Sequence, residues 1–293
     1  MRVLIFGADG IIGKSLVKEL SDSFNVIAID KEFKDIADKT WLTCKTKILD
    51  ITSFIDVKEV IKKNDVVINL AAISRITECN NDLMHSLGVN VTGAINIMEA
   101  CRQNNAKQLI QASSLYAKGS FGGFYSASKR AMESYLECFS ESTILNITLL
   151  RLGSISGGLD DYNSLPTKIL RRILKINKDK INVNSRIVRD YLPIDGVCKS
   201  IKPIIGNKDY YGYEVEFSLD NPLSLDGLIS EIEHVTGKNP RDYLEINHDV
   251  GTFKSQYLET PSIRSDLKYL RINIKDKSSS FRDFLERVFN AHR

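Results

Sequence analysis

Short apolar runs alternate with amphipathic stretches over the first half of the chain. The runs are rich in aliphatic and β-branched residues, as buried strands are, and we predict strands at Val3–Phe6, Asn25–Ile29, Thr46–Leu49, Val66–Leu70, Gln108–Ala112 and Ile147–Leu150. The stretches between them carry apolar residues at helical spacing, and we predict helices at Ile12–Leu20, Ile55–Lys62, Val91–Asn104 and Tyr125–Ser140. Strands and helices in this alternating order predict a parallel sheet with helices on both faces.

The pattern becomes irregular after Arg151. Here we predict helices at Thr167–Lys175, from Asp195, at Leu225–Thr236 and at Ser280–Phe289, with strands at Ile181–Val183 and Val215–Leu219. The expected fold is therefore α/β: a doubly wound parallel sheet in residues 1–152 and a smaller C-terminal α/β lobe in residues 153–293. Segments of such a lobe can rejoin the main sheet.

Length and composition indicate an ordinary globular protein. The 293 residues are 43% hydrophobic and 26% charged, which is enough to bury a sizeable core. No run of about 18 apolar residues occurs, so we expect no membrane span. Met1 leads directly into the first predicted strand without the apolar stretch of a secretory signal, and we expect a cytoplasmic protein.

The cysteines and the charge exclude several kinds of site. The five cysteines are scattered and include no CxxC pair, so we expect neither a disulfide framework nor a metal site. The formal net charge of +3 is spread along the chain, which does not favour a nucleic-acid partner. A few local positive charges would still suit an anionic ligand.

Three glycines follow the first predicted strand at the spacing GxxGxxG and open the first predicted helix. Glycine permits a tight turn, lets backbone N–H groups approach a pyrophosphate and leaves the positive end of the helix dipole open to it. This context predicts a dinucleotide site at Gly7, Gly10, Ile11, Ile12 and Gly13.

Further cofactor contacts are expected where the next strands end. Asp30 ends the second strand, where a carboxylate can accept hydrogen bonds from the adenosine ribose and repel a 2′-phosphate. We therefore predict NAD as the cofactor, while Lys31 and Lys34 nearby leave NADP open. At the end of the third strand, the Asp50 side chain and the Ile51 backbone could reach the adenine. At the end of the fourth strand, the backbone of Leu70, Ala71 and Ala72 could lie against the cofactor.

Tyr125 and Lys129 lie four residues apart at the start of a predicted helix and therefore share one face. A tyrosine with the ordinary pKa of about 10 is a poor base at neutral pH. An ammonium group and a positive nicotinamide ring nearby would lower the pKa of the phenol. Ser113 and Ser114 end the fifth strand, at the edge where such sheets bind ligands, and a serine there can orient the reacting oxygen.

In this combination and order the chain resembles the extended short-chain dehydrogenase/reductase superfamily, specifically its NAD-dependent epimerase/dehydratase family. The resemblance covers essentially the whole chain, and it includes Asn90-Val-Thr-Gly-Ala and the segment Arg189-Asp-Tyr-Leu-Pro-Ile-Asp195. It implies a Rossmann-like NAD-binding domain, a substrate-binding C-terminal lobe, a nucleoside-diphosphate sugar as substrate and a homodimer, often built through a four-helix bundle.

The resemblance also assigns roles. It makes Ser114, Tyr125 and Lys129 catalytic, adds Asn90, Tyr125 and Lys129 to the cofactor contacts, and assigns substrate binding to Ser74, Ser113, Ser154 and Arg189. Ser154 stands where the family usually has asparagine. Leu115-Tyr116 replaces the Asp-Glu pair of the family's dehydratases, which disfavours dehydration. The interval from Ser114 to Tyr125 is shorter than in most of the family's epimerases.

Several activities remain open at this stage. A 4-epimerase that transfers hydride transiently and a reductase of 4-keto-deoxysugar nucleotides need the same residues, and Asp30 with a retained cofactor favours the epimerase slightly. A reductase of small carbonyl compounds would not need Arg189, and a nonenzymatic dinucleotide-binding regulator would not need Tyr125. The sequence names neither the sugar nor the nucleotide base.

Overall fold

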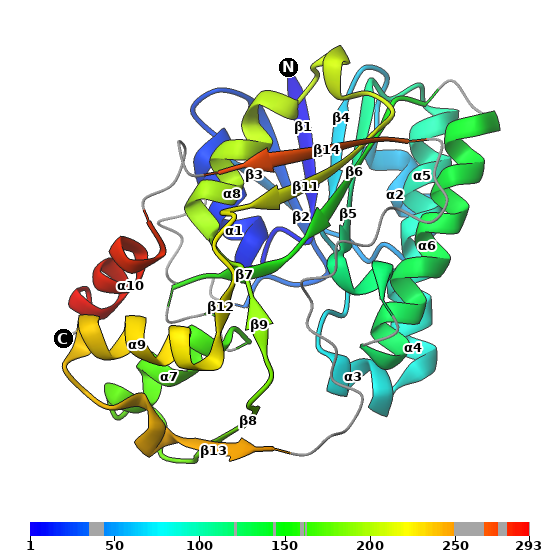
Figure 1. Ribbon diagram of the computed structural model, residues 1–293. Helices are drawn as coiled ribbons and strands as arrows, with labels where there is room; N and C mark the ends of the chain where they lie inside the picture. The colour runs from blue at the N-terminus through cyan, green and yellow to red at the C-terminus, as the bar shows by residue number, and fades with distance from the viewer. Residues whose placement is uncertain are drawn as a thin grey trace. The chain divides into compact units, whose positions relative to one another are not determined.

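A mainly parallel eight-stranded sheet dominates the computed structural model (Figure 1). The structure describes residues 1–34, 44–119, 122–142, 145–158, 161, 163–248, 267–274 and 280–292. These form two compact units. The first contains the described residues of 1–152, 198–216 and 260–271, and the second contains those of 153–197, 217–259 and 272–293.

The order of strands across the sheet is β14-β11-β6-β5-β4-β1-β2-β3. Each neighbouring pair from β11 to β3 is parallel. The strands are β1 (Arg2–Phe6), β2 (Asn25–Asp30), β3 (Lys45–Ile48), β4 (Val66–Asn69), β5 (Gln108–Ser114), β6 (Ile147–Leu152), β11 (Tyr213–Ser218) and β14 (Lys268–Asn273). The order reverses between β1 and β4, and the carboxyl ends of strands at such a switch point form the ligand-binding crevice of doubly wound folds.

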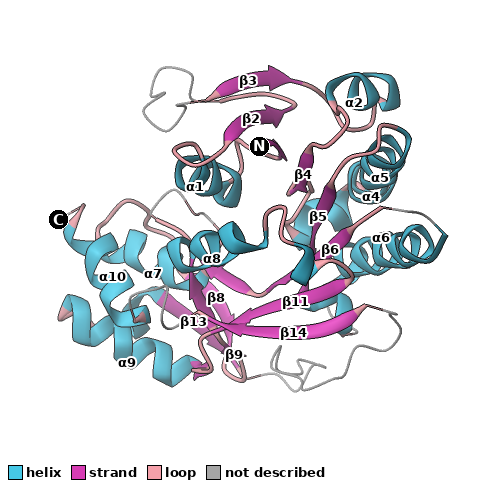
Figure 2. Cartoon of the chain, turned by 90° about the horizontal axis from the view of Figure 1, so that it is seen from above, coloured by secondary structure: helices cyan, strands magenta, loops and turns pink. Residues whose placement is uncertain are grey.

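Helices lie on both faces of this sheet. Figure 2 shows α2 (Phe54–Val60), α5 (Ala94–Gln103) and α6 (Gly123–Ser142) on one face and α1 (Ile11–Leu20) on the other. Apolar side chains of β1, β4, β5 and β6 meet those of α2, α5 and α6 in one core, which includes the fully buried Phe6, Ile97, Met98 and Leu109. The predicted α/β class and doubly wound parallel sheet are confirmed.

The second unit is built from shorter elements. Its strands are β7 (Ser154–Ser156), β8 (Ile181–Asn184), β9 (Val188–Arg189), β10 (Tyr191–Pro193), β12 (Leu223–Ser224) and β13 (Leu244–Asn247), which pair as β7–β10, β9–β12 and β8–β13. Its helices are α7 (Leu165–Ile173), α9 (Leu225–Thr236) and α10 (Phe281–Asn290), and α8 (Ile194–Ile201) begins in it and continues into the first unit. Phe281 stacks on Tyr191 with ring centroids 5.5 Å apart.

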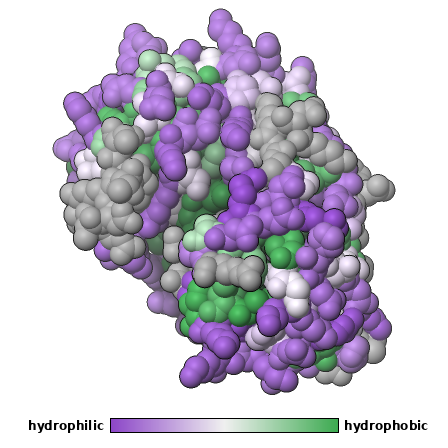
Figure 3. Space-filling view, turned by 90° about the vertical axis from the view of Figure 1, so that its left-hand side faces the viewer, coloured by the Kyte–Doolittle hydropathy of each residue, from purple (hydrophilic) through white to green (hydrophobic). Residues whose placement is uncertain are grey.

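Two helices of the first unit were not predicted. They are α3 (Ile76–Asn81) and α4 (Leu83–Leu87), which are only six and five residues long and therefore too short to show helical periodicity. The predicted helix Val91–Asn104 is divided, because Gly88–Gly93 forms a π-helical turn before α5. The surface in Figure 3 is mostly hydrophilic, with apolar side chains in smaller groups. No helix in the described part of the chain is both long enough and apolar enough to cross a membrane.

Candidate active site

The glycine loop and the segment after β4 meet at the switch point of the sheet. Gly7 has a φ of +79°, and a Cβ at this position would lie 2.6 Å from the backbone nitrogen of Ala71. A Cβ on Gly13 would overlap the carbonyl oxygen of Gly7 and the backbone of Ala8. Only glycine fits these two positions, so the loop lies directly against residues 70–71.

This loop also leaves the start of α1 open. Gly10 caps the helix without a side chain, and the N–H groups of Ile11, Ile12 and Gly13 belong to the first turn, where an α-helix offers no intrahelical acceptor. Backbone donors, the helix dipole and the absence of side chains together form a cradle that fits a pyrophosphate. The residues present therefore fit a dinucleotide cofactor.

Asp30 lies beside this loop at the end of β2. Its carboxylate accepts hydrogen bonds from the backbone N–H of Asp9 and of Lys31, both at 2.8 Å. Burial raises the pKa of the Asp30 carboxyl group, and the two backbone donors partly offset that rise. The structure thus places Asp30 next to the glycine loop. A residue that contacts the adenosine ribose of a bound dinucleotide must lie there.

The remaining predicted cofactor contacts lie along the same carboxyl edge. The Asp50 carboxylate accepts hydrogen bonds from the backbone and hydroxyl of Thr52, at 2.9 and 2.8 Å. The Ile51 side chain is buried, and a Cβ on Gly93 would lie 2.6 Å from it. The Ile51 carbonyl accepts a hydrogen bond from Asn96 at 3.0 Å, which leaves the backbone N–H of Ile51 for a ligand. Leu70 donates its backbone N–H to Phe6 at 2.9 Å, which holds residues 70–72 beside the glycine loop.

Asn90 is used for internal structure. Its buried amide accepts a hydrogen bond from the backbone N–H of Ile73 at 2.8 Å and donates to the Ile73 carbonyl and the Ser128 hydroxyl, both at 3.0 Å. Asn90 thus ties the segment after β4 to α6. Ser74, which follows Ile73, is exposed.

The three residues predicted to be catalytic come together where β5 ends and α6 begins. Tyr125 forms a side-chain hydrogen bond with Ser114, which also accepts one from the backbone N–H of Tyr116 at 3.2 Å. Lys129 is one turn further along α6 and donates from Nζ to the carbonyl oxygen of Ala112 at 3.2 Å. All three are buried, with exposed fractions of 9% or less.

In the protein without a bound cofactor, burial is the largest influence on the pKa values of Tyr125 and Lys129. It raises the pKa of Tyr125 to about 12, against a smaller lowering by the hydrogen bond from Ser114. It lowers the pKa of Lys129 to about 8, although the nearby Glu133 carboxylate opposes this. In the absence of a cofactor, burial thus disfavours both the phenolate and the ammonium, because removal from water disfavours charged forms. The predicted lowering of the phenol pKa requires the positive nicotinamide ring as well as Lys129, and it stays a prediction.

Ser113 is engaged by a buried ionic network. Its hydroxyl donates to Glu133, which binds Arg151 through Nε at 3.0 Å and Nη2 at 2.6 Å. Arg151 also contacts Glu214 of β11. Lys118, in the short turn after Ser114, lies 3.3 Å from Glu214 and 2.7 Å from Glu216. The network therefore joins β5, β6, β11 and α6 directly beneath the cluster.

Sequence reasoning missed most of this network and two nearby groups. Glu133 follows Lys129 by four residues and so shares its face of α6, a spacing that was visible in the sequence. Cys79 donates from Sγ to the carbonyl of Ile73 at 3.3 Å, and burial raises the pKa of its thiol. Asp9, inside the glycine loop, contacts the residues that follow β2. The contacts of Asp9 join residues that are distant in sequence, so local spacing could not identify them.

The two remaining substrate predictions fall in the second unit. Ser154 begins β7, which pairs in parallel with β10. Arg189 ends β9 and pairs with Leu223 of β12. The next residue, Asp190, accepts hydrogen bonds from Ser218 at 2.9 Å and from the backbone N–H of Leu219 at 2.8 Å, which fixes the end of β9.

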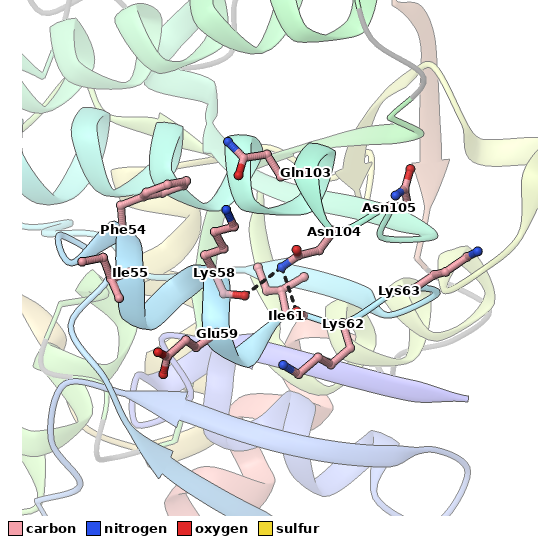
Figure 4. A pocket seen from close by; sticks show the side chains of 10 residues that line it. All are labelled: Phe54, Ile55, Lys58, Glu59, Ile61, Lys62, Lys63, Gln103, Asn104 and Asn105. Carbon is pink, nitrogen blue, oxygen red and sulfur yellow. Dashed lines mark hydrogen bonds between the residues drawn. The ribbon is translucent and has the colours of Figure 1, made fainter.

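A surface cavity of about 720 Å³ lies away from this chemistry (Figure 4). It is lined by residues along α2, by the end of α5 and by the segments that follow these helices and lead into β4 and β5, including Lys58, Lys62 and Asn104. Asn104 closes its floor by donating to the carbonyl oxygens of Lys58 and Ile61 at 2.7 and 2.9 Å. Among the residues that the structure describes, no group of three or more His, Cys, Asp or Glu side chains could hold a metal ion.

Comparison with known proteins identifies the family. The NAD dependent epimerase/dehydratase family matches residues 3–211 of the chain, which include the glycine loop, the serine pair and Tyr125 with Lys129. The chain belongs to this family. The predicted resemblance is thereby confirmed.

Individual relatives of this epimerase/dehydratase family member are distant but full length. Protein CapI of Staphylococcus aureus is 23% identical, with 97% of this chain and 98% of that protein covered. The structure of a UDP-N-acetylglucosamine 4-epimerase from Methanobrevibacter ruminantium has a TM-score of 0.79 at 20% identity, covering 99% of this chain and 97% of that one. A UDP-glucose 4-epimerase from Thermus thermophilus, solved with NAD, has a TM-score of 0.78 at 19% identity and covers 100% and 99%. These similarities establish the shared fold.

Proposed function

We propose that this chain is an NAD-dependent 4-epimerase of a nucleoside-diphosphate sugar. The observation that carries the proposal is the buried cluster of Ser114, Tyr125 and Lys129 at the same carboxyl edge of the sheet as the open glycine cradle. A proton-transferring phenol at a dinucleotide site is the minimum machinery for moving hydride to and from a sugar carbon. Membership of the family and the 4-epimerases among the structural neighbours support this choice.

The first turn of α1 would hold the cofactor's pyrophosphate, and Asp30 its adenosine ribose. When bound, NAD supplies a hydride acceptor and a positive charge next to the reacting carbon. Lys129 would bind the nicotinamide-side ribose from its place one turn beyond Tyr125. Leu70, Ala71 and Ala72 would form the wall behind the cofactor.

Tyr125 would exchange the proton of the sugar's 4-hydroxyl group. Its phenolate is disfavoured by burial, so added positive charge and the hydrogen bond from Ser114 are needed to make it a base near neutral pH. Ser114 would also donate to the reacting oxygen as charge develops there. Loss of this proton together with the C4 hydride would leave a 4-keto sugar. When the hydride returns to the other face of C4, the Tyr125 hydroxyl would return its proton to the C4 oxygen.

The four residues predicted to bind substrate would share that role. Arg189 would bind the diphosphate, because a guanidinium can form paired hydrogen bonds to phosphate oxygens. Ser154 and Ser74 would contact the sugar. Ser113 is a weaker candidate, since its hydroxyl already donates to Glu133.

The quaternary structure belongs to the same proposal. Met84, Leu87 and Tyr135 on α4 and α6 are exposed by 72%, 41% and 50%, which leaves an apolar surface that a second copy would cover. We propose a homodimer through this surface. Sedimentation analysis of the wild type and of Met84→Lys tests it: a monomeric wild type contradicts the proposal.

Mass spectrometry of the denatured protein tests for retained NAD(H), and incubation with UDP-, GDP-, CDP- and dTDP-sugars tests for epimer formation. A 4-epimerase converts one of these sugars without net use of added cofactor. Stoichiometric NADH consumption with a 4-keto sugar nucleotide would instead identify a reductase. Tyr125→Phe should abolish turnover while dinucleotide binding persists, and unchanged turnover would exclude Tyr125 from the chemistry.

A further inference from the structure

Asp9 occupies the middle of the glycine loop and contacts the residues that follow β2. Its backbone N–H donates to Asp30 Oδ2 at 2.8 Å. Its carboxylate accepts a hydrogen bond from the backbone N–H of Lys34 at 3.3 Å. The Asp9 side chain is only 11% exposed. Asp9 and Asp30 therefore place two carboxylates at the ribose end of the proposed cofactor site.

Two nearby lysines are already paired with carboxylates. Lys14, in the first turn of α1, has its Nζ 3.4 Å from Asp9 Oδ1. The ammonium group of Lys34 lies 3.3 Å from Glu32. Lys34 was one of the two lysines that left NADP open from the sequence. A phosphate bound here would have to compete with these carboxylates for each ammonium.

We propose that Asp9 is a second determinant, beside Asp30, that selects NAD against NADP. The proposal rests on the proposed dinucleotide site. The 2′-phosphate of NADP would bring negative charge towards both carboxylates, and one cation that could neutralise it, Lys14, is held by Asp9. Asp9 thus acts twice: it adds a negative charge, and it removes a positive one.

The size of the effect follows from the charges. Two unit charges a few ångströms apart near a protein surface interact by more than about 1.4 kcal/mol, the energy that corresponds to a tenfold change in affinity. Allowing for screening by solvent and salt, neutralising Asp9 should raise NADPH affinity at least about tenfold.

The test measures binding rather than turnover. Dissociation constants for NADH and NADPH are determined by cofactor fluorescence or calorimetry, on protein freed of bound nucleotide. The variant Asp9→Asn keeps an acceptor for the Lys34 N–H but loses the charge. We expect its NADPH affinity to rise at least about tenfold, while its NADH affinity changes by less than about threefold. An unchanged NADPH-to-NADH ratio overturns the proposal.

Two further variants assign the cause. In Asp9→Asn/Lys14→Met, most of the gained NADPH affinity should disappear, because the released ammonium is gone; if the gain persists in full, the part of the proposal that involves Lys14 is wrong. Asp22→Asn, at the far end of α1, makes the same change in net charge and should leave the ratio unaltered.

Failure of this inference is distinct from failure of the proposed function. If wild-type protein binds neither dinucleotide, the proposed function is wrong. If it binds NADH and Asp9→Asn does not change the ratio, only the role of Asp9 is wrong. Should Asp9→Asn fail to fold, Asp9→Ser is measured in the same assays, with the same expected increase.

Discussion

The hydroxyl group of Ser113 donates a hydrogen bond to the buried carboxylate of Glu133, one turn beyond Lys129 on α6. Glu133 in turn binds Arg151 with two nitrogen atoms. The end of β5, which carries Ser114, is therefore fixed to the helix that carries Tyr125 and Lys129. Glu133 is a positioning residue in this arrangement, since its hydrogen bonds are to Ser113 and Arg151 and it acts on Lys129 through its charge.

Glu133→Gln should destabilise the fold and impair turnover together. The change leaves the Arg151 guanidinium without a buried counter-charge on one side, and breaking a buried ion pair in this way typically costs about 3–5 kcal/mol. Chemical denaturation measures the loss of unfolding free energy. The control is Glu59→Gln on the exposed surface of α2, which should be neutral. A Glu133→Gln variant as stable as wild type would show that the pair contributes little.

The adjacent serines should behave differently. Ser114→Ala removes the hydrogen-bond partner of Tyr125 and should lower kcat by about 100-fold, the scale found for loss of one preorganised donor, with little loss of stability. Ser113→Ala should lower unfolding free energy by about 1–3 kcal/mol, because a buried acceptor on Glu133 loses a donor, and it should retain most of the turnover. The reverse assignment of the two effects would show that Ser113 is the catalytic serine.

Activity should fall as the pH rises above about 8. Burial lowers the pKa of Lys129 to about 8, so its ammonium group is present below that pH and is lost above it. If the ammonium binds the cofactor ribose and supports the phenolate, kcat/KM should show an alkaline limb near this value. A flat profile from pH 7 to about 10 would contradict a role for the charged form.

The lowered pKa of Lys129 also predicts how the free energy of unfolding changes with pH. Between about pH 8 and its ordinary pKa of 10.5, Lys129 binds a proton in the unfolded chain but not in the folded one. Stability rises with pH wherever the unfolded state binds more protons. The contribution of Lys129 to unfolding free energy should therefore increase over this range, and a parallel titration of Lys129→Met should lack the increase.

Two glycine-to-alanine substitutions test whether the glycine loop is closely packed. In Gly13→Ala, the added methyl group would overlap the Gly7 carbonyl oxygen and the Ala8 backbone, so we expect a loss of about 1–3 kcal/mol in stability and weakened NAD binding. Gly88→Ala is the matched control, since nothing lies within 4 Å of a Cβ there. Denaturation and NADH titration compare the two variants, and equal behaviour would mean that the cradle is not closely packed.

Arg189→Ala should affect substrates selectively. If Arg189 binds a diphosphate, its loss should raise KM for the sugar nucleotide by at least about tenfold, which is the scale of a charge-assisted hydrogen bond. Reduction of a small ketone should be unchanged. An equal effect on both substrates would point to a structural role for this residue.

The sequence by itself determined the doubly wound parallel sheet, because alternating apolar runs and amphipathic stretches have few packing solutions. It also placed the glycine loop, Asp30, the serine pair and Tyr125 with Lys129 at strand ends or helix starts, since in a parallel sheet these positions share one edge. Local spacing was sufficient for these features.

Only the tertiary structure decided which partners these residues have. The contact of Ser113 with Glu133, the hydrogen bond from Asp9 to Asp30 and the contacts of Arg151 with Glu133 and Glu214 join residues distant in sequence. Such contacts depend on strand order and on the register of α6 against β5, which local patterns do not encode. The direction of the Tyr125 pKa shift was decided in the same way, because burial is a property of the whole packed unit.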